Sequence, residues 1–237
     1  MTDANKTEVV VVVDRSGSMQ SIREDAEGGL NSFLDKMKMT PGDIRLTLAQ
    51  FNSEYRMLYE NQTIREVPKY VLVPRSSTAL YDAIGMTMWR VGERLSHTPE
   101  HDRPGKVVFM IVTDGEENDS HEYTRDQVKK MITEQKNKYG WQFSYFCTSE
   151  NALYDGMRLG MDQSSVFRFT PSGMGVRGAY GCAGQSVCNY VSGVTRSVDH
   201  GTGMVDAQGN IVQDPLKHIN LNPQQGGSHG NGGTGKQ

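Results

Sequence analysis

Two continuous apolar runs dominate the pattern of hydrophobic and polar positions. Residues 9–13 are all valine and residues 107–112 are all apolar, and each run is followed within two residues by an aspartate. Runs that are apolar on both faces are typical of parallel strands buried between two layers of helices. By the same criteria we predict strands at residues 8–13, 44–51, 106–113, 141–147 and 166–169. Weaker strand patterns lie at residues 57–59 and 70–73.

Helical periodicity fills the segments between these strands. Apolar residues recur at intervals of three and four, as on one face of an amphipathic helix. The pattern predicts helices within residues 22–37, 80–95, 123–132, 152–161 and 176–194. Because strands and helices alternate, the chain is expected to form parallel βαβ units and a three-layer α/β fold.

The alternation of strand and helix patterns ends after residue 197. Residues 205–212 fit a short hairpin around a glycine-containing turn, and from residue 222 the chain is glycine, asparagine and glutamine with almost nothing to bury. We therefore predict one α/β domain over residues 1–197. Residues 198–237 are predicted to be a C-terminal extension with a hairpin and a disordered, glycine-rich tail.

Composition narrows the classes of function. The chain has 237 residues and a formal net charge of −3, which argues against a broad nucleic-acid-binding surface. The valine run is far too short to cross a membrane, and the amino terminus lacks the pattern of a secretory signal. Three cysteines without CxxC spacing predict reduced core residues rather than disulfides or a zinc site. These features predict a cytoplasmic protein.

Oxygen-bearing side chains cluster at the ends of the two buried strands. Asp14, Ser16 and Ser18 follow the first strand, and Asp114 follows the other. Loops at the carboxyl ends of parallel strands share one edge of the sheet, where ligands bind. Thr78 stands directly before a predicted helix; its loop could reach the same edge, although strand order alone does not place it there.

These five side chains offer the hard oxygen ligands that suit Mg²⁺, with Mn²⁺ and Ca²⁺ as alternatives. Only Asp14 and Asp114 carry charge, so a bound divalent cation would stay poorly neutralised. An external carboxylate or phosphate would complete its coordination.

The order Asp-x-Ser-x-Ser, a distant Thr and then Thr-Asp-Gly resembles the metal-ion-dependent adhesion site (MIDAS) of von Willebrand factor A domains over residues 8–195. The resemblance implies a Rossmann-like, mostly parallel sheet with one antiparallel edge strand, for which residues 57–59 are the candidate. It also implies direct metal contacts from Ser16 and Ser18, and from Thr78 in the ligand-engaged state. Asp14 and Asp114 would act mostly through bound water, and a partner's Asp or Glu would take the open position.

The function expected from this resemblance is a non-catalytic module that captures an acidic group of a protein partner, with neither nucleic acid nor membrane involved. The chain resembles stand-alone intracellular members from prokaryotes and phages, some of which work beside ATPase-linked complexes. A metal-dependent phosphoester hydrolase and a metal-free structural domain are the alternatives.

Charged residues near the predicted edge leave several roles open. Glu116, Glu117, Asp119 and Asp82 could tune the metal, repel acidic competitors or be solvated loop charges, and the last role is favoured for Asp119. Arg15 could help to hold an incoming carboxylate, but is expected to point to solvent.

Two glycine-rich motifs offer weaker alternatives. Residues 173–178 fit GxGxxG, which could open a dinucleotide site, but a tight turn into a closely packed helix is the favoured reading. Residues 230–236 nearly fit a phosphate-binding loop, but lack the required Ser or Thr and a preceding strand.

Overall fold

The computed structural model describes residues 1–201 and 203–218, so the predicted disordered tail and the glycine-rich motif at residues 230–236 lie outside the described residues. The strands are β1 (Asp3–Asp14), β2 (Asp43–Phe51), β3 (Tyr55–Thr63), β4 (Pro104–Val112), β5 (Gln142–Cys147), β6 (Val166–Phe169), β7 (Gly203–Val205) and β8 (Ile211–Gln213).

The α-helices of the described chain are α1 (Arg23–Met39), α2 (Leu80–His97), α3 (Arg125–Tyr139), α4 (Glu150–Arg158) and α5 (Gly173–Val191). They fall where the apolar periodicity predicts them. Within the described residues, none of these helices combines the length and the apolar character needed to cross a membrane.

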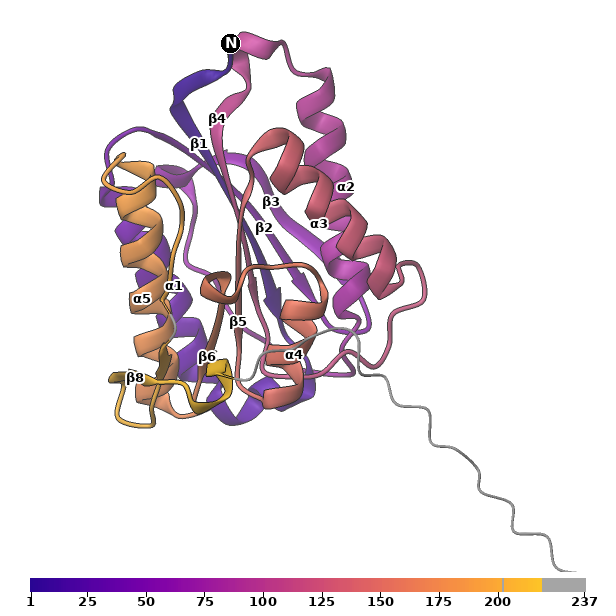
Figure 1. Ribbon diagram of the computed structural model, residues 1–237, viewed down its shortest axis with the longest axis vertical. Helices are drawn as coiled ribbons and strands as arrows, with labels where there is room; N and C mark the ends of the chain where they lie inside the picture. Colours follow the sequence, from indigo (N-terminus) through magenta and orange to yellow (C-terminus); the bar gives the residue numbers. More distant parts are fainter. Residues whose placement is uncertain (202, 219–237) are drawn as a thin grey trace, which may run out of the picture.

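One sheet organises the molecule (Figure 1). Its described strands follow the order β3-β2-β1-β4-β5-β6-β7-β8. The six inner strands, β2, β1, β4, β5, β6 and β7, run parallel. The edge strands β3 and β8 pair antiparallel with β2 and β7, respectively. The predicted α/β fold is confirmed, and so is the antiparallel edge strand expected at residues 57–59, which lies inside β3.

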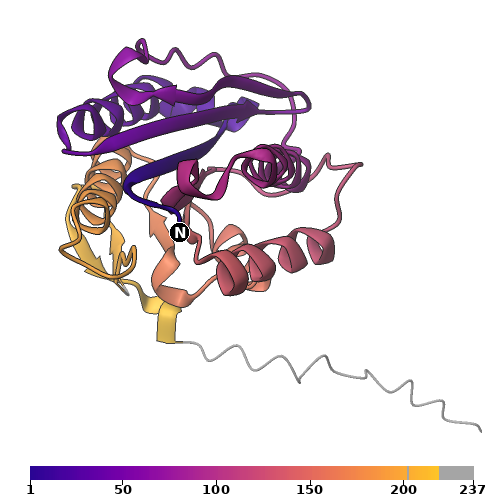
Figure 2. The same ribbon diagram turned by 90° about the horizontal axis from the view of Figure 1, so that it is seen from above.

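Helices cover both faces of the sheet (Figures 1 and 2). Alternate valines of β1 supply both cores, since successive side chains of a strand point to opposite faces. Val9, Val11 and Val13 pack with α1 and α5, whereas Val10 and Val12 pack with α2, α3 and α4. This two-sided burial explains why the run contains only β-branched apolar residues.

The strand order reverses at β1. From β1 the chain goes outward to β2 and β3, and then returns to β4 on the other side of β1. The loops that leave the carboxyl ends of β1 and β4 therefore diverge in opposite directions, which is the place where open α/β sheets bind ligands.

Residues 70–73 do not form the weak strand that their alternation suggests. Tyr70 and Leu72 are buried and Val71 and Val73 exposed, but the segment pairs with no strand among the described residues. Side chains of α1 take its hydrogen bonds instead. The Tyr70 amide donates to Asn31 and the Leu72 amide donates to Glu27.

The glycines of the 173–178 motif serve close packing, as the favoured reading predicts. The helix α5 begins at Gly173, capped by the hydroxyl of Ser172. A Cβ atom on Gly175 would lie 2.2 Å from the Thr170 carbonyl oxygen, and one on Gly178 would lie 2.6 Å from Val205 Cγ1. Only glycine lets the backbone of α5 approach the sheet so closely at these points.

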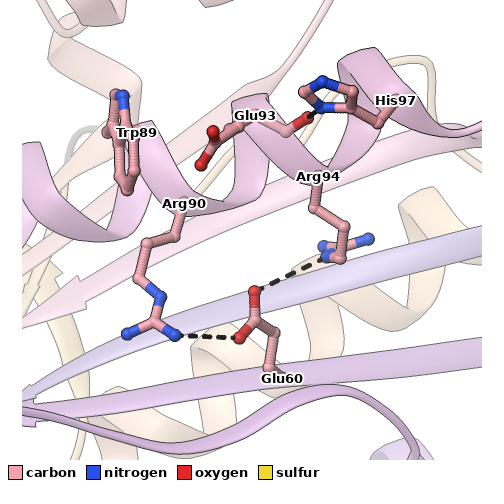
Figure 3. Close-up of a pocket in the computed structure, with 6 residues that line it drawn as sticks. All are labelled: Glu60, Trp89, Arg90, Glu93, Arg94 and His97. Atoms are coloured by element: carbon pink, nitrogen blue, oxygen red, sulfur yellow. Dashed lines mark hydrogen bonds and ion pairs between the residues drawn. The ribbon is translucent and has the colours of Figure 1, made fainter.

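An ionic network fastens α2 to the sheet (Figure 3). Arg90 and Arg94 of α2 reach Glu60 of β3, at 3.3 and 3.8 Å, respectively. Arg94 also pairs with Glu8, a carboxylate of β1 that is only 1% exposed and accepts a hydrogen bond from the Thr47 hydroxyl. Arg90 and Arg94 line a pocket beside α2, and both are matched by carboxylates.

The predicted hairpin is present as β7 and β8, and it extends the sheet beyond β6. The sheet therefore runs past the boundary predicted at residue 197. The division into residues 1–197 and 198–237 stays a prediction.

Two neighbouring glycines of α1 allow a test of the packing between α1 and α5. A Cβ atom on Gly29 would lie 2.4 Å from the Tyr180 ring of α5, whereas one on Gly28 would meet nothing within 4 Å. We expect Gly29→Ala to lower the free energy of unfolding by about 1–3 kcal/mol through overpacking. Gly28→Ala should raise it by about 0.5–1 kcal/mol, because alanine favours the helix. Urea denaturation of both variants checks this, and equal effects of the two substitutions would contradict it.

Candidate functional site

The ends of β1 and β4 lie side by side at the sheet edge. Val13 pairs with Val112, so Asp14 and Thr113 emerge next to each other. The Thr113 hydroxyl donates to Asp14 Oδ2 at 2.6 Å, and the Ser16 amide donates to Asp14 Oδ1 at 2.7 Å. The Asp14 carboxylate is fully buried and fixed at both oxygens.

A chain of hydroxyl contacts links the β1 loop to the β4 loop. The Oγ atoms of Ser16 and Ser18 are 3.0 Å apart. The Ser18 hydroxyl donates to Asp114 Oδ1 at 2.7 Å. Ser16 is buried, whereas Ser18 is exposed, so the chain leads from the interior of the sheet edge to its surface.

Gly115 marks the point on which the oxygens converge. A Cβ atom on this glycine would lie 3.3 Å from Thr78 Oγ1, 3.5 Å from Ser18 Oγ and 3.7 Å from Asp14 Oδ2. Together with the hydroxyl contacts, this brings all five predicted side chains to one edge of the sheet. We call this group of Asp14, Ser16, Ser18, Thr78 and Asp114 the oxygen cluster.

Strand order does not determine the position of Thr78. Hydrogen bonds between its loop and two other loops hold it in the oxygen cluster. The Thr78 amide donates to Asn118 Oδ1 at 2.9 Å, and the Asn118 amide donates to the Thr78 carbonyl at 3.0 Å. On the other side, the Gly17 amide donates to the Ser76 carbonyl at 2.9 Å. Ser76 has φ 67°, a left-handed backbone conformation that is unfavourable for a non-glycine residue.

Two of the neighbouring acids cap backbone amides. Glu117 accepts the Tyr81 amide at the start of α2, together with the amides of Asp119 and Ser120. In return, Asp82 of α2 accepts three successive amides of the loop that follows, those of His121, Glu122 and Tyr123. This exchange locks the loop after β4 to α2.

The other two acids differ in their surroundings. Asp119 is half-buried and accepts the Ser77 hydroxyl, so the expectation of a solvated loop charge is wrong for this residue. Glu116 is exposed and accepts the Asn151 side-chain amide at 2.7 Å.

Arg15 does not point to solvent, which corrects the prediction from the sequence. It is only 5% exposed, and its guanidinium lies 3.4 Å from Glu54 Oε2. Its position in the strand period explains the difference. As an odd-numbered residue following Val9, Val11 and Val13, it continues on the face of the sheet that α1 and α5 cover.

The sequence analysis missed three residues that shape the site. Thr113 fixes Asp14, Asn118 fixes Thr78, and Gly115 leaves the space between the oxygens. Thr113 and Gly115 belong to the Thr-Asp-Gly motif. The apolar run before this motif predicts a strand, but it does not predict that the Thr113 side chain turns toward Asp14. No local pattern signals the contact between Asn118 and Thr78, which are 40 residues apart.

Burial governs the ionisation of the two carboxylates. It raises the pKa of Asp14 from 3.8 to about 6, against hydrogen bonds from Thr113 and Ser16 that lower it, and the like charge of Asp114 adds to the rise. Burial also raises the pKa of Asp114, while the Ser18 hydroxyl opposes it. Neither carboxylate has an ion pair with a Lys, Arg or His among the described residues.

The donor set of the oxygen cluster fits a hard divalent cation. It combines two carboxylates with three hydroxyls, and Gly115 leaves room between them. A site based on three or more His, Cys, Asp or Glu side chains is a different kind, and the described residues contain no such group.

Comparison with known proteins identifies the family. The model of the von Willebrand factor type A (VWA) domain matches residues 8–155, and the chain therefore belongs to this family. VWA domains are usually non-catalytic modules that mediate protein–protein interactions. A search of curated proteins found no match.

Solved structures share the fold at low sequence identity. Proximal thread matrix protein 1 from the mussel byssus, described with a zinc-occupied MIDAS motif, has a TM-score of 0.54 and 15% identity, covering 78% of this chain and 46% of that one. A von Willebrand factor type A protein from Catenulispora acidiphila has a TM-score of 0.54 and 12% identity, covering 78% and 43%. The conserved hypothetical protein BatB from Bacteroides thetaiotaomicron has a TM-score of 0.51 and 16% identity, covering 81% and 100%. The match thus spans less than half the length of the byssus protein.

The raised pKa of Asp14 predicts the pH dependence of the metal-free protein. Between pH 3.8 and about 6 the folded state holds a proton that the unfolded state has released. Stability should therefore fall as the pH rises through this window, by about 3 kcal/mol for this group. Urea denaturation in a chelating buffer checks the slope. Asp14→Asn should flatten it, and an unchanged slope in that variant would contradict the assignment.

Proposed function

We propose that the chain is a divalent-metal-dependent protein-binding module whose oxygen cluster is a MIDAS. The observation that carries the proposal is the convergence of Thr78, Ser18 and Asp14 oxygens around the space beside Gly115. Asp14 and Ser18 come from the end of β1 and the loop that follows it, Thr78 comes from the loop before α2, and Gly115 comes from the loop after β4, so three separate segments meet at this space.

The residues that would hold the ion are those of the oxygen cluster, and the expected ion is Mg²⁺, with Mn²⁺ and Ca²⁺ as alternatives. The zinc-occupied MIDAS motif of the byssus protein, which shares this fold, supports a divalent ion here. The three hydroxyls add no charge, and the family resemblance has Asp14 and Asp114 act mostly through bound water, so the ion keeps an open position for an external carboxylate. A partner's Asp or Glu carboxylate supplies the missing negative charge.

The surrounding acids favour a binding module over a phosphoester hydrolase. Glu117 and Asp82 are occupied with backbone amides, so neither is poised as a general base. Turnover of phosphoester substrates that is lost in Asp14→Ala would instead favour the hydrolase. A cytoplasmic location, a prokaryotic or phage source and an ATPase-linked partner stay predictions from the sequence.

The first test removes two hydroxyls of the oxygen cluster. We expect Ser16→Ala combined with Ser18→Ala to weaken Mg²⁺ and Mn²⁺ binding by about tenfold or more, as measured by calorimetry. The fold should survive, because both residues lie in a loop outside the two cores. A control variant with Ser32→Ala and Ser96→Ala removes two exposed hydroxyls that bond only to their own helix.

Equal metal affinity of the two double variants would sink the proposal. So would an absence of heat and of thermal stabilisation when millimolar Mg²⁺ or Mn²⁺ is added to the unsubstituted protein, since the metal-free structural alternative predicts that result.

The second test fills the space beside Gly115. Gly115→Ala places a methyl group 3.3 Å from Thr78 Oγ1 and 3.5 Å from Ser18 Oγ, so it should weaken metal binding by about tenfold or more while retaining the fold. Gly17→Ala is the matched control, because its methyl group meets only the Ser76 carbonyl, at 3.4 Å. Metal titration of both variants by calorimetry measures the difference, and retention of full affinity in Gly115→Ala would place the ion elsewhere.

A further inference from the structure

A second pocket, of about 430 Å³, opens on the α1 face of the sheet beside the loop after β1. Four cationic side chains line it, and we call it the basic pocket: Arg15, Arg56, Lys69 and Arg75. Gln50 and Tyr70 also contribute, joined by a hydrogen bond from the Tyr70 hydroxyl to Gln50 Oε1 at 3.1 Å.

Positive charge is in excess in the basic pocket. Glu54 is the acid that pairs with its cations, and its Oε2 is shared between Arg15 at 3.4 Å and Arg75 at 3.3 Å. Arg56 and Lys69 are exposed and form no ion pair with any described residue. The pocket in Figure 3 differs in this respect, because Glu60 and Glu8 match its two arginines.

Arg15 gives the strongest sign of a missing anion. Its side chain is 6% exposed, yet its acceptor Glu54 is 69% exposed, and the contact between them is long. Its buried Nε atom has no hydrogen-bond partner among the described residues. A buried guanidinium is costly unless an anion and hydrogen bonds compensate it.

The basic pocket is joined to the oxygen cluster through the backbone. Arg15 stands between Asp14 and Ser16 in the chain, and its carbonyl accepts the Arg75 amide at 2.8 Å. The next residue, Ser76, accepts the Gly17 amide. A partner bound at the oxygen cluster therefore lies next to the entrance of the basic pocket.

Exposed apolar side chains flank the same pocket. Val71 is 62% exposed and Val73 is 54% exposed, and both contribute to its lining. Cationic groups that alternate with exposed valines suit an extended polypeptide better than a compact inorganic anion, since a small anion would need its donors to converge on one point.

We propose that the basic pocket binds an acidic segment of the protein partner, one in which apolar residues alternate with Asp or Glu. The pocket is then a second contact beside the metal-bound carboxylate. This proposal rests on the proposed function only in assigning both contacts to the same partner, because the pocket itself needs no metal.

The test uses a short fluorescein-labelled peptide of alternating glutamate and leucine, followed by fluorescence anisotropy with the full chain in a chelating buffer. We expect Arg56→Glu combined with Lys69→Glu to weaken binding by about tenfold or more, and added salt to weaken binding to the unsubstituted chain. The control, Lys129→Glu with Lys130→Glu on α3, changes the net charge equally at exposed positions and should bind like the unsubstituted chain.

Equal binding of the two charge-reversal variants would overturn the proposal, as would equal binding of a glutamine-leucine peptide. Should the first variant fail to fold, Lys69→Gln is the substitute, with a smaller loss expected. Inorganic phosphate that displaces the peptide at equimolar concentration would show a compact anion site and would also overturn it. Because the chelator removes metal ions, failure here leaves the metal titrations of the oxygen cluster unaffected.

Discussion

The buried carboxylate of Asp14 is the constraint on which the rest of the site depends. It stands at the end of the central strand, out of contact with water, with both oxygens fixed by Thr113 and Ser16 and with the like charge of Asp114 nearby. Burial of a charge without a counter-charge costs free energy, so this carboxylate prefers a proton or a cation. The fold thus places a carboxylate that favours a bound cation at the point where the strand order reverses.

Hydrogen bonds between the surrounding loops fix the shape of the site around Asp14. Glu117 caps α2 while Asp82 caps the loop after β4, and Asn118 pairs with Thr78 in both directions. These contacts tie the loop after β4 to the loop before α2 and to the start of that helix. They also hold the hydroxyl of Thr78 at a fixed position, as a preorganised binding site requires.

The sequence predicted the layered fold and the shared edge of Asp14, Ser16, Ser18 and Asp114 from short-range patterns, whereas Thr78 was included because of the family resemblance. Apolar runs that end at Asp14 and Asp114 identify buried parallel strands, and strand ends share an edge. The position of Thr78 depends on contacts with Asn118 and Ser76 in other loops, which periodicity does not encode. Arg15 was misplaced for a related reason, since its polarity suggested exposure while the strand period turned it inward.

Metal binding removes the negative charge of the oxygen cluster in the proposed arrangement. Without an ion, Asp14 and Asp114 repel an acidic partner, and only the excess cations beside Arg15 attract it. A divalent ion would cancel the two negative charges of the oxygen cluster and offer an open coordination position to a carboxylate, so both contacts would then draw the same partner. The chain as a whole carries a net charge of −3, so long-range attraction of an acidic partner is weak and recognition must be local. In this proposal, metal occupancy would decide between weak and firm binding, while the basic pocket would decide where the partner lies.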